Sequence, residues 1–195
     1  MMNTASSPMD ILRESLGTLL EPVATPPFVM VSGLPGTGKS YFCRQLLQKL
    51  DVTCVESDSL RKVLFSSPSY GADESARLFP LIYVLIDELL SHGVPVVYDA
   101  TSLLERHREY LYDIALRHQA WLIIVRVEAP SETVRQRLQY RDSVGATWDA
   151  SDADWGVYQH MKEELQPIHR GNFAVDTSRD IGPVIDKISR EVNRK

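Results

Sequence analysis

The sequence predicts an α/β fold in which helices cover both faces of a parallel sheet. Short apolar runs alternate along the chain with longer segments of helical period. Strands separated by helices pair in parallel, and such a sheet is buried on both faces. A glycine-rich turn that ends in Gly-Lys-Ser lies between the first apolar run and the next helical segment. Right-handed crossovers place the C-terminal ends of all the strands on one rim, where α/β proteins bind ligands.

The composition suits one compact domain with a full core. The chain has 195 residues, of which 44% are hydrophobic, and its net charge is −5. An acidic chain creates no overall field that would draw it to nucleic acid or to an anionic membrane. No apolar run reaches the roughly 18 residues of a membrane span, and no charged-then-apolar leader opens the chain. We therefore expect a cytoplasmic protein without a membrane partner, with a helix and linker in residues 1–27 and a single domain over 28–195.

Each predicted strand is a short run of apolar and β-branched residues. Pro26 and Pro27 impose an extended lead into the first strand. The second strand ends in Ser57-Asp58, and the third ends in Asp99, so acidic residues are expected on the binding rim. The predicted strands are 28–32, 52–56, 94–98, 121–127 and 172–175.

The predicted helices begin at capping residues and end near proline or polar turns. Ser7 and Pro8 predict the start of a short amphipathic helix that breaks before Pro22. A helix over about 74–91 is apolar almost all round, which predicts burial against the sheet, with Pro80 in its first turn or at a kink. Ser102 to Glu105 predicts a capping box that opens the next helix. The other predicted helices are 39–50, 60–65, one that begins at Ser131, 151–166 and 183–192.

The stretch from Gly33 to Ser40 fits the pattern G-x-x-x-x-G-K-[ST] between a strand and a helix. There the glycines let the backbone curl around an anion, and the first amides of the helix converge on phosphate oxygens. Lys39 is expected to reach the β- and γ-phosphates of ATP, and the Ser40 hydroxyl to ligate Mg²⁺. The alternative is a glycine-rich turn with a chance lysine. The predicted nucleotide contacts are Gly33, Leu34, Pro35, Gly36, Thr37, Gly38, Lys39, Ser40 and Tyr41.

Asp58 and Arg61 follow the second strand as Asp-x-x-Arg. A carboxylate beside the γ-phosphate would accept the proton of an attacking hydroxyl, while charge neutralisation lowers most of the barrier. Arg61, one helical turn on, would hold a substrate anion or orient Asp58. The alternative is an ordinary N-cap aspartate with a solvated arginine. Because the phosphate-binding stretch lies one crossover away, we predict that both residues belong to a substrate site.

Asp99 ends the third strand, where proteins with such a phosphate loop keep an acidic residue for Mg²⁺ or its water shell. The predicted metal site is therefore Ser40 with Asp99. Ala100 stands where many motor ATPases carry a glutamate that activates water, which disfavours efficient hydrolysis. Thr101 is predicted to contact substrate, and its alternative role is to begin the turn before the next helix.

Arg137 and Arg141 lie four residues apart on one predicted helix, just before a polar loop at 142–151. Arginines in this place would clamp the transferring phosphoryl group, and a lid at about 138–155 would exclude water. The alternative is a solvated basic face. The predicted catalytic residues are Lys39, Asp58, Arg137 and Arg141.

Taken in order, these residues resemble a family of small phosphate-loop (P-loop) kinases that includes polynucleotide 5′-hydroxyl kinase and zeta-type toxins. The resemblance extends over about residues 28–190. The P-loop is specific for nucleotide binding, and the other matches gain weight from their order and spacing. The matching stretches are Gly33 to Ser40, Asp58 with Arg61, Val97 to Thr101, Glu105-Arg106, Glu128 to Pro130, Arg137 with Arg141, and Ser151 to Asp154.

The resemblance implies a P-loop NTPase fold, with a five-stranded parallel sheet in the order 2-3-1-4-5 and a helical lid. It also implies MgATP as the donor and a hydroxyl as the acceptor, with Asp58 as general base and Arg61 on a substrate phosphate. The lid arginine of the family corresponds to Arg141, with Arg137 as a neighbouring candidate. Since this chain is acidic and interleaves no basic and aromatic residues in a groove-like pattern, nucleic acid is a less favoured substrate than a small molecule.

The sequence thus predicts an ATP- and Mg²⁺-dependent kinase that acts on a hydroxyl of a small or medium-sized substrate. One alternative is a nucleotide-binding regulatory module with weak ATPase activity, which would signal through the N-terminal helix or the 74–91 helix. Another is a 5′-hydroxyl polynucleotide kinase. Acceleration of slow ATP turnover by a hydroxyl compound distinguishes the kinases from the regulatory module.

Overall fold

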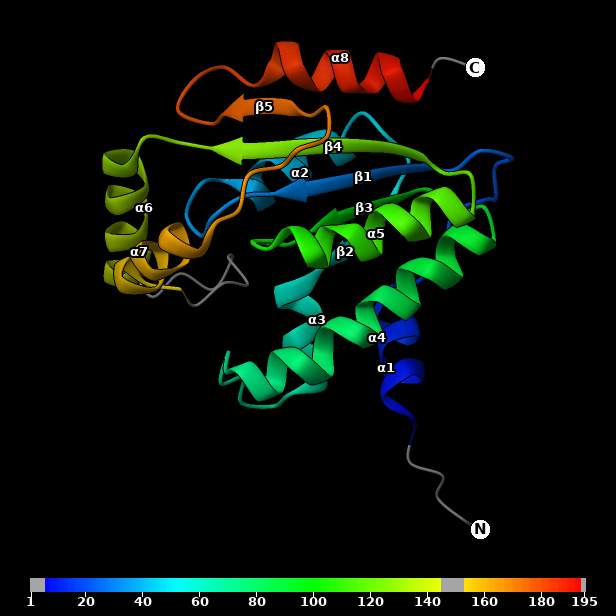
Figure 1. Ribbon diagram of the computed structural model, residues 1–195, viewed down its shortest axis with the longest axis horizontal. Helices are drawn as coiled ribbons and strands as arrows, with labels where there is room; N and C mark the ends of the chain where they lie inside the picture. The colour runs from blue at the N-terminus through cyan, green and yellow to red at the C-terminus, as the bar shows by residue number, and fades with distance from the viewer. Residues whose placement is uncertain (1–5, 145–152, 194–195) are drawn as a thin grey trace.

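The computed structural model describes residues 6–144 and 153–193 (Figure 1). Its centre is a sheet of five parallel strands in the order β2-β3-β1-β4-β5. This order confirms the predicted P-loop NTPase topology. The strands are β1 (Pro27–Ser32), β2 (Thr53–Glu56), β3 (Val96–Asp99), β4 (Trp121–Glu128) and β5 (Phe173–Asp176).

Helices connect the strands and flank the sheet, and eight of them lie in the described ranges. Their positions agree with the predicted alternation of strand and helix. They are α1 (Pro8–Ser15), α2 (Lys39–Leu47), α3 (Ser57–Leu64), α4 (Ala72–Ser91), α5 (Glu105–Arg117), α6 (Ser131–Val144), α7 (Trp155–Glu164) and α8 (Gly182–Val192).

The two strands at the centre of the sheet, β1 and β3, are buried along their whole length. Apolar side chains fill them up to a polar last residue, as suits strands covered on both faces. In the parallel register, Val31 pairs with Asp99 and Ser32 pairs with Arg126. The polar strand ends therefore meet on one rim, at the end of the sheet where α6 and α7 lie in Figure 1.

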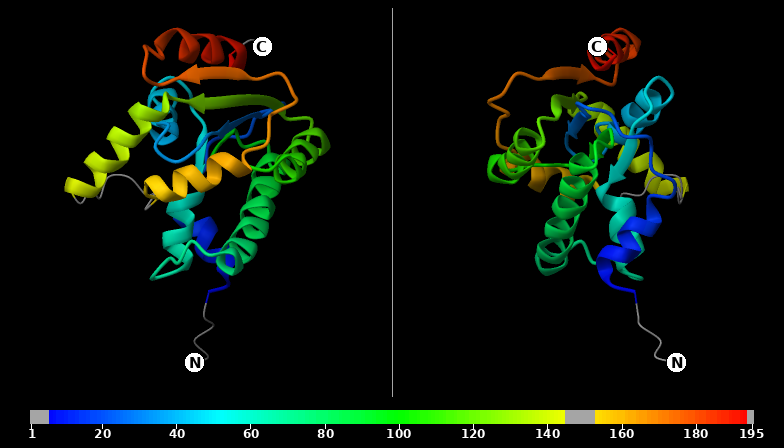
Figure 2. Two further views of the ribbon diagram at one scale, coloured as in Figure 1. Left: turned by 60° about the vertical axis from the view of Figure 1, so that its left-hand side comes forward. Right: turned by 90° about the vertical axis from the view of Figure 1, so that its right-hand side faces the viewer.

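The sheet separates two hydrophobic clusters. On one face, α2 and α8 bury Phe42 and Ile188 against the strands. On the other face, α1, α4 and α5 bury Leu12, Leu78 and Leu111. The right-hand view of Figure 2 shows α2 and α5 on opposite sides of the sheet. A third cluster joins α6 and α7 to the glycine-rich loop and consists of Leu34, Val134, Leu138 and Tyr158.

The first helix begins as predicted and ends sooner. The Asp10 amide donates to Ser7 Oγ at 3.2 Å, and the Ser7 amide donates to Asp10 Oδ2 at 3.2 Å, which completes a capping box. The helix ends at Ser15, and Gly17, with a φ of 68°, then turns the chain.

One other predicted detail differs from the structure, and one predicted alternative is excluded. Ser102 does not cap α5, so the predicted capping box there is wrong: the N-cap is Leu104, and Ser102 has a φ of 49°. The Glu105 carboxylate accepts a hydrogen bond from Arg108 Nε at 2.6 Å, and this contact replaces the box. Of the two predicted places for Pro80, the first turn of α4 is excluded, because Pro80 lies inside the helix, and a kink there stays a prediction.

Within the described ranges, no helix is both long enough and apolar enough to cross a membrane. The lid predicted at about 138–155 includes residues 145–152, and most of the predicted loop 142–151 falls there too. These residues lie outside the described ranges, as do residues 1–5 of the N-terminal segment.

Candidate active site

The loop between β1 and α2 has the backbone shape that its glycines predict. Gly36 and Gly38 have φ values of 73° and 92°, which glycine adopts readily. Gly33 approaches β4 so closely that a Cβ there would lie 2.3 Å from the Val127 carbonyl oxygen. Gly38 is also the N-cap of α2, so the first amides of that helix face the loop without a side-chain cap. The loop is therefore built to hold an anion through backbone N–H groups.

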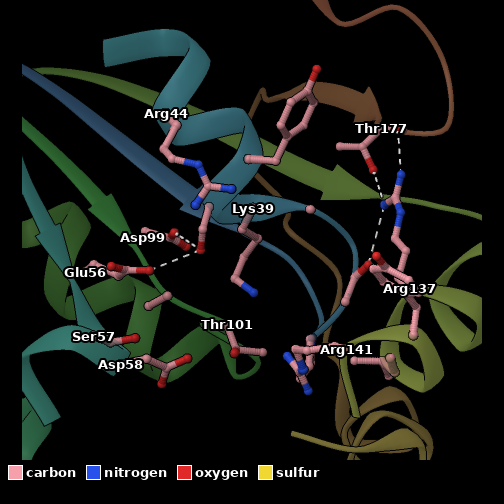
Figure 3. Close-up of a pocket in the computed structure, with 18 residues that line it drawn as sticks. Lys39, Arg44, Glu56, Ser57, Asp58, Asp99, Thr101, Arg137, Arg141 and Thr177 are labelled. Atoms are coloured by element: carbon pink, nitrogen blue, oxygen red, sulfur yellow. Dashed lines mark hydrogen bonds between the residues drawn. The ribbon is translucent and has the colours of Figure 1, made fainter. Parts of the chain in front are cut away.

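This P-loop forms one wall of a cavity of about 540 Å³ on the C-terminal rim of the sheet (Figure 3). The volume lies within the usual range of ligand sites. The predicted site residues that line the cavity are Pro35, Gly36, Gly38, Lys39, Ser40, Tyr41, Asp58, Asp99, Thr101, Arg137 and Arg141. The lining residues that the sequence analysis missed are Arg44, Glu56, Ser57, Ala100, Leu138, Tyr140 and Thr177.

Three of the predicted nucleotide contacts, Gly33, Leu34 and Thr37, face the other side of the loop. There they line a second cavity of about 540 Å³ together with α7 and the segment that leads to β5. Thr37 Oγ1 donates a hydrogen bond to the Leu34 carbonyl oxygen at 2.7 Å, which holds the loop in its turn. The Leu34 and Thr37 side chains thus support the loop from behind, and Gly33 packs there through its backbone.

Lys39 points into the middle of the first cavity (Figure 3). Its Nζ donates a hydrogen bond across the loop to the Leu34 carbonyl oxygen at 3.3 Å. In the same view, acidic side chains from the ends of β2 and β3 lie on one side of Lys39, and the arginines of α6 lie on the other. A polyanion on the loop would therefore meet cations on one side and carboxylates on the other.

Ser40 faces two carboxylates. Its Oγ lies 2.9 Å from Asp99 Oδ2 and 3.1 Å from Glu56 Oε1, but one hydroxyl proton serves only one of them at a time. Asp99 is 3% exposed, and burial raises its pKa to about 6, against the lowering effects of Lys39 and of the Ser40 hydrogen bond. Glu56 raises the pKa further. Ionising the buried Asp99 is therefore costly unless a cation lies beside it.

The donors around Ser40 fit a magnesium ion. A hydroxyl and two carboxylates make an all-oxygen set of the kind that Mg²⁺ prefers. In residues 6–144 and 153–193, no group of three or more His, Cys, Asp and Glu side chains is placed to hold a metal ion. A cation held by Ser40, Glu56 and Asp99 would thus complete its shell with phosphate oxygens and water, as Mg²⁺ does in nucleotide sites.

Glu56 is the acidic residue that the sequence analysis missed. It is the last residue of β2 and lies opposite Asp99 in the register of β2 and β3. Ser59 Oγ donates to its other carboxylate oxygen at 2.5 Å, which fixes the side chain. The available signal was an acidic residue at a strand end, but its partner depends on the pairing of two strands far apart in the sequence.

Asp58 is carried to the cavity by the start of α3. This helix begins at Ser57, directly after β2, so Asp58 lies in its first turn and lines the cavity. The helix dipole favours a negative charge there. Glu56, not Asp58, is the N-cap, so the alternative of an ordinary capping aspartate does not describe this helix.

Arg61 lies buried beside α4, outside the lining of the cavity. Its Nη1 donates to Glu74 Oε1 at 2.5 Å, its Nη2 donates to Ser75 Oγ at 3.3 Å, and its guanidinium lies 4.9 Å from the centre of the Tyr70 ring. The amide of Ser69 and Arg61 both donate to Glu74, and they lower the pKa of that carboxyl to about 2. Arg61 thus ties α3 to the start of α4, and a contact between Arg61 and a substrate stays a prediction.

Thr177, which follows β5, joins the P-loop to α6. Its Oγ1 donates to the Thr37 carbonyl oxygen at 2.5 Å. Arg137 donates to Thr177 Oγ1 at 2.8 Å and to the Thr177 carbonyl oxygen at 2.9 Å. Arg141 lies one turn further along α6, where it lines the cavity and donates to the Ala153 carbonyl oxygen. Arg137 therefore holds α6 to the loop, and Arg141 faces the space next to it.

Solved structures of three proteins illustrate the shared fold. Kti12 from Chaetomium thermophilum, solved with ADP-AlF3, has a TM-score of 0.68 at 17% identity, over 85% of this chain and 97% of that chain. The APS kinase CysC from Mycobacterium tuberculosis, solved with AMPPNP and APS, has a TM-score of 0.64 at 18% identity, over 88% and 99%. A gluconokinase from Sinorhizobium meliloti 1021 has a TM-score of 0.61 at 19% identity, over 87% and 93%.

These identities establish a common fold and do not transfer a substrate. No curated protein sequence matches the chain. A family model described as an AAA domain, AAA_33, matches residues 28–168, which include the P-loop, Asp58, Asp99 and the arginines of α6. The chain therefore belongs to the AAA_33 family of AAA domains, and its fold is that of the P-loop kinases.

Proposed function

We propose that the protein is an ATP-dependent kinase that phosphorylates a hydroxyl of a small or medium-sized substrate. The observation that carries the proposal is the meeting of a P-loop, a helix-borne carboxylate and two arginines around one cavity. In this proposal the P-loop and Lys39 hold the donor, and Asp58, which lines the same cavity, faces the second substrate. Kinases among proteins of the same fold support this reaction class.

In the proposed reaction, the acceptor oxygen attacks the γ-phosphorus of ATP. The bond from that phosphorus to the oxygen bridging to the β-phosphate breaks, and ADP leaves with the bond electrons. Asp58 takes the proton of the acceptor hydroxyl, and Lys39 neutralises charge on the β- and γ-phosphates. A base on the rigid first turn of α3 can hold its geometry while the acceptor varies.

Ser40, Asp99 and Glu56 would hold the magnesium ion of MgATP. The ion supplies positive charge that neutralises the phosphate oxygens. A cation there would favour the ionised form of Asp99, so the site would bind metal and nucleotide together more strongly than either alone.

The two arginines of α6 receive different roles. Arg137 already donates to Thr177 and keeps α6 against the P-loop. Arg141 lines the cavity one helical turn further on, and we assign to it the contact with the γ-phosphoryl group. Thr101, in the loop after β3, borders the same space and would contact the acceptor.

The assay that tests the proposal follows conversion of MgATP to MgADP with a panel of hydroxyl acceptors. The panel includes sugars, polyols, nucleosides and a 5′-hydroxyl oligonucleotide, and mass spectrometry identifies a phosphorylated product. We expect slow turnover alone and strong acceleration by one acceptor class, because Ala100 provides no carboxylate next to Asp99 to activate water. Salt-sensitive transfer to the oligonucleotide would select the polynucleotide kinase instead.

Rapid hydrolysis without an acceptor would contradict the proposal, above all if Asp58→Asn leaves that hydrolysis unchanged. The variant is informative because asparagine keeps the size of the side chain and removes its basicity. Binding of MgADP to the variant, measured by calorimetry, controls for an intact P-loop.

A further inference from the structure

Arg108, on α5, is the most completely buried charged residue in the described ranges, with 0% of its surface exposed. All five N–H donors of its guanidinium are used. Nε donates to Glu105 Oε2 at 2.6 Å, and Nη1 donates to the carbonyl oxygens of Ser102 at 2.6 Å and Leu103 at 3.0 Å. Nη2 donates to the carbonyl oxygens of Gln166 at 2.9 Å and Pro167 at 2.8 Å. Four of the five donors thus bind carbonyl oxygens of two separate segments and hold them together, and the fifth binds a carboxylate of the same helix.

The two segments are the loop from β3 to α5, residues 100–104, and the segment after α7, residues 165–168. Two further bonds join them directly. The Gln166 amide donates to the Leu103 carbonyl oxygen at 3.0 Å, and the Glu105 amide donates to Gln166 Oε1 at 2.8 Å. Arg108 thus stands at the centre of a junction between segments about sixty residues apart.

The junction continues into the candidate active site. The Thr101 carbonyl oxygen accepts a hydrogen bond from Ser32 Oγ at 3.0 Å and one from the Gly33 amide at 3.4 Å. The first loop therefore joins the start of the P-loop directly, and its Thr101 lines the cavity. Ser102, next along, has a φ of 49°, a conformation that few non-glycine residues adopt without support. Arg108 Nη1 holds that residue through its carbonyl oxygen.

The second segment leads back to α7. Tyr158 on α7 packs in one cluster with Leu34 of the P-loop and with Val134 and Leu138 of α6. Holding the segment after α7 therefore also holds α7 against α6, the helix that carries both site arginines. Both paths from Arg108 end at the P-loop, one through Thr101 and one through α7.

We propose that Arg108 is a positioning residue for phosphoryl transfer, which sets Thr101 and the helix pair α6–α7 relative to the P-loop. This inference rests on the proposed kinase function. The role requires arginine, because lysine has three donors at one point and cannot reach four carbonyl oxygens in two segments together with the Glu105 carboxylate. The Arg108 contacts align the acceptor side of the site with the donor phosphate. Losing them should therefore weaken binding of the transition state more than binding of ADP.

The test compares Arg108→Lys with Arg117→Lys. Arg117 lies on the same helix, but its ion pair with Asp87 is exposed. Arg117→Lys therefore controls for the replacement of arginine by lysine as such. Gln166→Ala is a milder second variant, because it removes one bond of the junction and leaves Arg108 in place. Circular dichroism and urea unfolding first establish that each variant is folded.

Calorimetry then measures the affinities for MgADP and for MgADP with aluminium fluoride, which imitates the transferring phosphoryl group. We expect MgADP affinity within about twofold of the wild type in all variants, and a loss of about 10- to 100-fold for the aluminium fluoride complex in Arg108→Lys. Gln166→Ala should show a smaller loss, and Arg117→Lys none. Equal losses for both ligands, or none for Arg108→Lys, would overturn the positioning role.

Hydrogen–deuterium exchange separates this inference from the proposed function. The inference predicts faster exchange at residues 32–34, 100–104 and 165–168 in folded Arg108→Lys, with β4 unchanged. Unchanged exchange there would overturn the anchoring. If the wild type shows no preference for the aluminium fluoride complex, the kinase proposal fails and the positioning role fails with it. The exchange result then reports whether Arg108 anchors the loops at all.

Discussion

A single hydroxyl between two carboxylates is the residue-scale feature that most constrains the chemistry. Ser40 Oγ lies within 3.1 Å of both Glu56 and Asp99, and burial raises the pKa of Asp99 to about 6. A buried acid with a raised pKa lowers the stability of the folded state once the acid ionises. Such an arrangement suits a site where a cation binds with the nucleotide, because the bound cation then offsets the free-energy cost of ionising the buried Asp99.

The raised pKa of Asp99 predicts a stability that depends on pH. An unfolded chain ionises this carboxyl near 3.8, so the folded protein binds more protons between about pH 4 and pH 6. The free energy of unfolding of the metal-free wild type should therefore fall across that window. Asparagine does not titrate, so the free energy of unfolding of Asp99→Asn should not fall in this way. Relative to the wild type, it should rise by about 2–3 kcal/mol from pH 4 to pH 7. Urea unfolding of both proteins at a series of pH values measures this difference in the free energy of unfolding.

Asp51→Asn, at an exposed position, is the matched control for loss of a carboxyl group. A constant difference between Asp99→Asn and the wild type over this pH range would rule out the raised pKa. Adding Mg²⁺ with ADP should stabilise the wild type more at pH 7 than at pH 5, since the proposed metal ligand is the ionised carboxylate of Asp99.

Lys39 and Asp58 are expected to separate binding from chemistry. Lys39→Ala should abolish tight MgATP binding, because it removes the cation that faces the phosphates. Asp58→Ala should bind MgATP as the wild type does and lose phosphoryl transfer by about 10²- to 10⁴-fold. Calorimetry and the acceptor assay measure the two effects. Lys49→Ala, at an exposed ion pair with Asp186, serves as a control, and full turnover in Asp58→Ala would remove the base assignment.

At the scale of elements, the P-loop is shaped as much by α6 as by its own glycines. A Cβ on Gly36 would lie 2.9 Å from Val134 Cγ1 and 3.0 Å from Leu138 Cδ2. Arg137 of the same helix donates to Thr177, which follows β5 and in turn donates to the Thr37 carbonyl oxygen of the loop. The loop is therefore clamped between α6 and the end of β5, and a side chain added at Gly36 would push α6 outward.

Gly36→Ala and Gly17→Ala form a matched pair that tests this clamp. Both glycines have a positive φ, 73° and 68°, so each alanine carries a backbone strain of about 1–2 kcal/mol. Only Gly36 has neighbours within 4 Å of the new Cβ. We expect Gly36→Ala to weaken MgADP binding by about tenfold or more, and Gly17→Ala to leave it unchanged. Similar affinities in the two variants would show that α6 does not shape the loop.

At the scale of the whole molecule, the N-terminal helix is packed with the core of the kinase-like fold. Leu12 of α1 is 0% exposed and belongs to the same cluster as Leu78 and Ile86 of α4. Arg13 Nη2 donates to Glu88 Oε1 at 2.7 Å, which adds an ion pair between the two helices. Residues before the family match at 28 thus contribute to the stability of the residues after it.

Leu12→Ala should lower the free energy of unfolding by about 2–5 kcal/mol, because it leaves a cavity in the core. Leu19→Ala is the matched control, since Leu19 is 46% exposed and should change stability by no more than about 0.5 kcal/mol. Urea unfolding measures both values. Equal effects would mean that α1 is only loosely attached.

The sequence by itself determined the class of the fold, the P-loop and the acidic residues at the strand ends. These features follow from local patterns, since alternation, glycine spacing and strand ends are all readable along the chain. The confirmed strand order came from a family resemblance, because no local sequence pattern shows which strands lie side by side in the sheet. The same limit explains the missed Glu56, whose place beside Asp99 depends on the register of β2 and β3.

Only the tertiary structure decided which polar groups have partners. Arg61, expected near a substrate, is buried against Glu74, thirteen residues away in the chain. Ser102, expected to cap α5, has its carbonyl oxygen bound by Arg108, and Thr177 joins loops from opposite ends of the sequence. A buried guanidinium or hydroxyl binds whichever acceptors the packed chain brings within reach, and the lowest free energy is a property of the whole arrangement.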